Sequence, residues 1–159
     1  MTQLKPVFEH TVTLPATQTA SEDAAEVVRT RLVGLLVQFA KSPDRLIGGL
    51  KCRRVVQNVT DTGILILERE LEVGKTMFCD TVTVTDRSVL FSVSPSGELK
   101  ASTFRITIEG GVQGDFVLRF HYEEDGQVIW PEPLLKLRTK AWKAKDQDIA
   151  AWCGRHLGF

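Results

Sequence analysis

Apolar and polar residues alternate cleanly over residues 7–14, which is the period of a half-buried β-strand, and the chain from 51 to 124 has the pattern of successive strands. Turn-forming sequences rich in glycine, aspartate and proline separate six such segments. The segments are residues 51–59, 64–73, 76–85, 88–94, 100–109 and 115–124, and residues 7–14 form a seventh near the start of the chain. Because turns this short connect only antiparallel neighbours, the pattern predicts an antiparallel sheet of six or seven strands.

Three stretches have helical spacing instead. From about Ser21 to Ala40 the apolar residues recur every three or four positions, and a second short helical segment begins at Ser42 and ends at Gly48. A longer amphipathic stretch covers residues 131–156 and begins with prolines that suit a first helical turn. Its expected apolar stripe is Leu135, Trp142, Ile149 and Cys153, with Leu134, Ala141 and Trp152 on the edges. The order predicts an α+β domain: one strand, two short helices, six strands, and a long C-terminal helix gripped by the curved sheet.

Composition narrows the functional classes. The 159 residues suit one domain over 1–159, and 20 basic against 20 acidic side chains give no bulk attraction to nucleic acid or anionic membranes. We expect no membrane span and a cytoplasmic location, because no apolar run has the length of a signal peptide or a spanning helix. Cys52, Cys79 and Cys153 lack metal-ligand spacing, so we expect buried thiols and no metal site.

Three polar side chains are candidates for chemistry in the space between the sheet and the long helix. His10 shares a strand face with Phe8 and Val12, where it is either a structural residue or an acid or base, because imidazole titrates near neutral pH. Asp80 also lies on an apolar strand face, and burial of its carboxylate is costly unless it is paired. Arg69, one strand earlier, is its expected partner. The alternative for Asp80 is an acid that orients a substrate carbonyl.

Aromatic and basic side chains are candidates for a ligand-binding wall, although each of the aromatic residues also suits a plain core. An apolar pocket with a few convergent polar groups is the usual small-molecule site. The candidates are Phe91, Phe104, Phe120 and Tyr122 on the strands and Arg138, Trp142 and Lys145 on the long helix. The sequence has no glycine-rich phosphate loop after a strand and no serine in a nucleophile elbow, so we expect no cofactor.

Four segments resemble the AtaL-like group of the START-like superfamily, also called the SRPBCC, pollen-allergen or helix-grip fold. They are FEHTV at 8–12, RLVGLLVQFAKSPDRLIGGL at 31–50, ERELEVGKTMFCDTVTV at 68–84 and LRFHYE at 118–123. The resemblance implies a helix-grip domain that binds a hydrophobic polycyclic or polyketide-type ligand in secondary metabolism. The group usually has a glutamate in the strand where this chain has Asp80, which is one methylene shorter.

We therefore expect a protein that encloses a hydrophobic metabolite and promotes its cofactor-independent cyclisation or isomerisation, cycloaddition included. The substrate would be of polyketide or terpenoid type, with His10, Asp80 and Arg69 as the catalytic candidates. A cavity that holds a reactive conformer and polarises it needs neither a nucleophile nor a metal. The alternatives are a passive carrier with the same cavity, and a protein–protein module whose cavity is filled by its own side chains.

Overall fold

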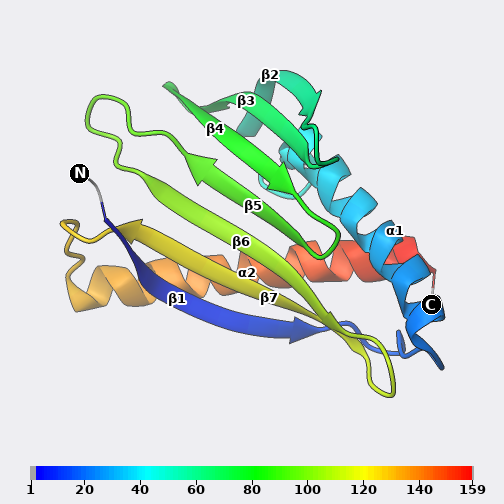
Figure 1. The fold of residues 1–159 in the computed structure, drawn as a ribbon. Helices are drawn as coiled ribbons and strands as arrows, with labels where there is room; N and C mark the ends of the chain where they lie inside the picture. Colours follow the sequence, from blue (N-terminus) through cyan, green and yellow to red (C-terminus); the bar gives the residue numbers. More distant parts are fainter. Residues whose placement is uncertain (1–2, 159) are drawn as a thin grey trace.

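The computed structural model describes residues 3–158, and its elements follow the predicted order (Figure 1). The strands are β1 (Leu4–Thr13), β2 (Leu50–Val59), β3 (Leu65–Val73), β4 (Thr76–Val84), β5 (Ser88–Val93), β6 (Ser102–Gly110) and β7 (Phe116–Asp125). The helices are α1 (Glu22–Lys41), the 3-10 turn η1 (Pro43–Arg45) and α2 (Glu132–Leu157).

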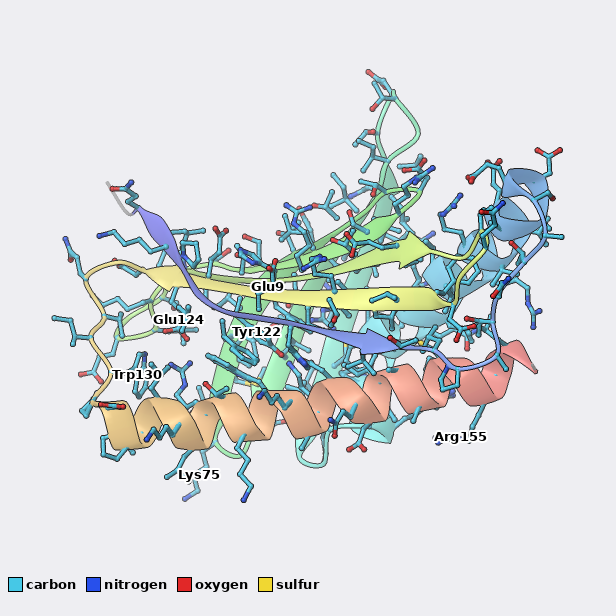
Figure 2. All side chains as sticks on the ribbon, turned by 90° about the horizontal axis from the view of Figure 1, so that it is seen from below. Glu9, Lys75, Tyr122, Glu124, Trp130 and Arg155 are labelled. Atoms are coloured by element: carbon cyan, nitrogen blue, oxygen red, sulfur yellow. The ribbon has the colours of Figure 1, made fainter. Side chains whose placement is uncertain are left out.

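The strands form one seven-stranded sheet in the order β1-β7-β6-β5-β4-β3-β2, and every neighbouring pair is antiparallel. The sheet curves, and α2 lies along its concave face, nearest β1 and β7 (Figures 1 and 2). Helix α1 covers the other part of this face and meets the end of α2. The predicted α+β helix-grip architecture is confirmed.

Local capping explains where α1 begins. The Ser21 hydroxyl accepts a hydrogen bond from the backbone N–H of Ala24 at 3.2 Å, and two acidic residues occupy the first turn. The second predicted short helix is the three-residue turn η1. Its Pro43 carbonyl accepts from the N–H groups of Leu46 and Ile47, and the chain then turns into β2 through Gly49, whose φ of +83° favours glycine.

The stripe predicted for α2 is buried only in its second half. Ile149, Trp152 and Cys153 are buried and Trp142 is partly buried, whereas Leu134 and Ala141 are exposed. The N-terminal half of α2 contacts the sheet along a narrow line, so the expected edges of the stripe face solvent. None of the helices within residues 3–158 combines the length and the apolar character that crossing a membrane requires.

The burial predicted for the three cysteines is right only for Cys153. Cys79 is exposed because it alternates with Phe78 and Asp80 on β4 and so points to the convex face. Cys52 is partly exposed on β2, the edge strand of the sheet.

Candidate ligand cavity

A cavity of about 170 Å³ lies where the concave sheet face, the end of α1 and α2 meet. Its position follows from the placement of α2 toward β1 and β7, which leaves the part of the sheet near β3, β4 and β5 covered by η1 and the last turn of α1. Its wall is formed mainly by apolar side chains: Phe39, Pro43, Ile47, Leu50, Leu71, Phe78, Phe91, Val93 and Phe104. Three charged residues complete it, namely Arg69, Asp80 and Lys145.

Arg69 and Asp80 pair across β3 and β4 with bidentate geometry. Arg69 Nε donates to Asp80 Oδ1 at 2.8 Å, and Nη2 donates to Oδ2 at 2.6 Å. A third donor, Nη1, lies 2.5 Å from the carbonyl oxygen of Ala40 at the end of α1. The pairing expected from the sequence is therefore present, and it ties α1 to the sheet.

Lys145 lies on the α2 side of the cavity, with its side chain 23% exposed. Its Nζ lies 3.8 Å from the centroid of the Phe104 ring and 4.9 Å from that of Tyr122, so two aromatic faces surround the amine. The nearest carboxylate oxygen is Oδ1 of Asp146, at 3.6 Å. This separation is an ion pair rather than a hydrogen bond.

Asp146 is the centre of a buried polar cluster that the sequence analysis missed. Its side chain is fully buried, and its Oδ2 accepts from His10 Nε2 at 2.7 Å. The Tyr122 hydroxyl lies 2.8 Å from Oδ1 and 2.7 Å from Oδ2, between the sheet and α2 (Figure 2). Asp146 lies four residues after Trp142 and three before Ile149, so the helical spacing itself placed a carboxylate on the buried stripe. That spacing was the available signal.

Burial shifts the protonation equilibria of this cluster. Desolvation raises the pKa of Asp146, and the opposing effects of Lys145 and of the hydrogen bonds from His10 and Tyr122 do not cancel it. Desolvation also lowers the pKa of Lys145, against the attraction of the Asp146 carboxylate. For Tyr122, burial and then the Asp146 charge raise the pKa, so its hydroxyl keeps its proton. Asp146, Tyr122 and Lys145 thus favour their uncharged forms more than the same groups would in water.

Stacked rings connect the cavity to this cluster. Ring centroids lie 5.5 Å apart for Phe91 and Phe104, 4.7 Å for Phe104 and Tyr122, and 4.3 Å for Tyr122 and Trp142. Phe120 lies behind this row, 6.1 Å from Phe104 and 5.4 Å from the imidazole of His10. The row forms an aromatic wall that runs from the cavity toward the N-terminal half of α2.

Apart from Arg138, the predicted site residues therefore fall into two groups. Arg69, Asp80, Phe91, Phe104 and Lys145 line the cavity. His10, Phe120, Tyr122 and Trp142 lie behind the lining.

Arg138 is separate from both groups. Its guanidinium lies 3.9 Å from the Trp130 ring centroid and 4.5 Å from that of Trp142, and it pairs with Glu124 (Figure 2 labels Glu124 and Trp130). A cation held between two indoles and a carboxylate closes the end of the helix–sheet interface.

A larger hollow of about 590 Å³ lies along α2, but its lining comes from α2 alone and includes three lysines. It has no second wall, so the smaller cavity is the better candidate for a ligand. Among residues 3–158, no group of three or more His, Cys, Asp or Glu side chains is arranged to hold a metal ion.

No family model matches the chain, and no curated protein matches its sequence. Several solved structures share its fold. The di-domain aromatase/cyclase StfQ of the steffimycin biosynthetic pathway aligns with a TM-score of 0.60 at 11% identity, over 94% of this chain and 50% of StfQ. This chain therefore spans half the length of that protein.

Two further structures match over almost their whole length. The Zhui aromatase/cyclase from Streptomyces sp. R1128 has a TM-score of 0.59 at 9% identity, over 98% of this chain and 96% of Zhui. A START superfamily protein from Mycobacterium smegmatis has a TM-score of 0.51 at 13% identity, over 95% and 99% of the two chains. Identities this low establish a START-like fold and nothing finer.

Proposed function

We propose that this protein binds a hydrophobic metabolite in the cavity between α2 and the sheet and promotes its cofactor-independent cyclisation or isomerisation. The observation that carries the proposal is the convergence of Arg69, Asp80 and Lys145 on one aromatic-walled cavity. The volume of about 170 Å³ lies below the roughly 300–1,000 Å³ of pockets for drug-sized ligands. It suits the reacting end of a ligand, with the remainder extending toward solvent.

The chemistry proposed is polarisation and positioning. Arg69 donates to the Asp80 carboxylate, and the fixed pair orients a ligand hydroxyl or carbonyl. His10 contacts Asp146 and does not line the cavity, so we assign it a positioning role exerted through Asp146. The aromatic wall holds the apolar part of the ligand in a reactive conformer.

The aromatase/cyclase activity of StfQ and Zhui agrees with a ring-closing role in secondary metabolism. The segments that resemble the AtaL-like group support the same assignment, and we propose that residues 1–159 form one such domain acting in the cytoplasm. A passive carrier is the second candidate, because the same cavity serves for holding a ligand. The open cavity argues against a module whose interior is filled by its own side chains.

The test is native mass spectrometry of freshly purified protein, followed by extraction of the bound small molecule. A Val93→Trp variant should fill the cavity and lose the ligand, whereas Val59→Trp, at an exposed position of β2, should retain it. Single-turnover incubation of the extracted compound or its open-chain precursor then separates an enzyme from a carrier. Equal ligand content in both variants would refute the proposed site.

A further inference from the structure

Lys145 differs from every other residue described in the lining of the cavity, because it alone carries an amine. Arg69 cannot act as a nucleophile, since its guanidinium stays protonated and donates its hydrogen bonds to Asp80 and Ala40. The Lys145 amine has no hydrogen-bond partner within 3.5 Å among the described residues, and its nearest anion is 3.6 Å away. It therefore faces the cavity with its nitrogen available.

We propose that Lys145 forms an imine with the carbonyl carbon of an aldehyde or ketone ligand bound in this cavity. The inference rests on the proposed function and deepens it, because it names the functional group of the substrate and the atom that receives it.

The step balances without any other reactant. The neutral Nζ attacks the carbonyl carbon, the C–N bond forms as the C=O π bond breaks, and one proton moves from the nitrogen to the oxygen to give a carbinolamine. The hydroxyl oxygen takes up a second proton, the C–O bond breaks and water leaves, while the C=N bond forms and the nitrogen gives up its second proton in exchange. Amine and carbonyl are converted to imine and water, and hydrolysis reverses the sequence.

The surroundings of Lys145 favour this step. Oδ1 of Asp146 lies 3.6 Å from Nζ, so a small rotation of the lysine side chain would let the carboxylate accept the proton of the ammonium group and return it to the departing oxygen. Burial lowers the pKa of Lys145 and raises that of Asp146, so a neutral amine beside a neutral acid is more accessible than at the surface. Desolvation by apolar or aromatic surroundings is one of the usual ways in which a protein makes a lysine amine nucleophilic.

An imine would also account for how the cavity promotes ring closure. Its protonated form withdraws electrons from the neighbouring carbon more strongly than the parent carbonyl does. A proton on that carbon becomes more acidic, and the enamine left behind attacks an electrophile elsewhere in the same ligand. The aromatic wall would hold the two ends together during this attack.

The experiment is reductive trapping with 2-naphthaldehyde and sodium cyanoborohydride, read by peptide mass spectrometry. At pH 7 the adduct at Lys145 should exceed that at Lys143 by about tenfold or more, since the cavity holds the bound aldehyde beside the Lys145 amine and burial lowers the pKa of that amine. Lys143 lies on the same helix and is exposed, so it reports background reactivity. Lys145→Met should abolish the specific adduct, and Lys143→Met should leave it unchanged.

Binding of 2-naphthylmethanol, the matching alcohol without a carbonyl, is measured in parallel by its fluorescence. If the alcohol saturates the protein but the adduct is no more abundant at Lys145 than at Lys143, the imine is refuted while the cavity stands. If neither compound binds, both the imine and the proposed function fail. Site mapping on the wild-type protein decides the question even if Lys145→Met does not fold.

Discussion

Replacing Asp80 with leucine is expected to destabilise the protein strongly, even though leucine suits an apolar strand face. Arg69 and Asp80 are only 5% and 4% exposed, so removal of the carboxylate leaves a guanidinium with one remaining acceptor, the carbonyl of Ala40. Breaking a buried pair from one side costs about 3–5 kcal/mol. For a chain of this length the melting temperature should fall by about 6–20 °C.

The double variant Arg69→Met/Asp80→Leu separates the pair from its surroundings. With both charges removed the desolvation penalty disappears, and methionine keeps the contact over the Phe91 ring, where the Arg69 guanidinium now lies 5.1 Å from the centroid. The hydrogen bond to Ala40 is lost, at about 1 kcal/mol. The double variant should therefore be closer to wild type than Asp80→Leu is.

The assay is urea unfolding of the wild type, both single variants and the double variant, analysed as a double-mutant cycle. Asp148→Leu is the control, because that aspartate is exposed on α2 and its replacement should change stability by no more than about 0.5 kcal/mol. An Asp80→Leu protein as stable as the wild type, or a double variant less stable than Asp80→Leu, would refute the reasoning. The first result would leave the pair with the orientation of the ligand as its only role.

Two further predictions concern α2. Trp142→Ala should lower the free energy of unfolding, but by less than the roughly 3–5 kcal/mol that truncation of a fully buried aromatic costs. The indole is only partly buried, against Tyr122 and Phe8. A urea midpoint equal to that of the wild type would contradict the predicted loss. Burial raises the pKa of the Cys153 thiol to about 12 from 9.0. The folded state therefore binds the thiol proton more tightly than the unfolded state does. The stability that this proton contributes is complete below pH 9 and is lost as the pH rises toward 12. Relative to Cys153→Ala, the free energy of unfolding of the wild type should fall by about 1.4 kcal/mol per pH unit in that window. Parallel plots of unfolding free energy against pH for the two proteins would disprove the prediction.

The pairing of Arg69 with Asp80 was accessible from the sequence because a turn fixes the register. Gly74 and Lys75 form a two-residue connection that pairs Val73 with Thr76, and four steps further along each strand Arg69 meets Asp80. The same alternation placed Cys79 on the opposite face from Asp80. The expectation that Cys79 is buried therefore conflicted with the face assigned to its neighbour.

The cluster around Asp146 was less accessible. His10 and Asp146 are 136 positions apart, and their contact depends on which part of the concave face receives α2. Strand alternation indicates that His10 points inward, and helix spacing places Asp146 on the buried stripe, but neither pattern gives the offset between helix and sheet. That offset also decided where the cavity lies, since α2 could have covered β3 and β4 instead.

The two charge pairs beside the cavity differ in a way that separates stability from reactivity. Arg69 satisfies both oxygens of Asp80 and an additional carbonyl, so this pair is held by well-defined hydrogen bonds. Asp146 already receives hydrogen bonds from His10 and Tyr122, and Lys145 is left at 3.6 Å as its third neighbour. The charge of Lys145 is less completely compensated by hydrogen bonds than that of Arg69. The Lys145 amine is therefore the group whose protonation state a bound ligand can most readily change. Substitutions of the first pair should therefore lower stability and impair ligand orientation, whereas substitutions of Lys145 should act mainly on the chemistry of the ligand.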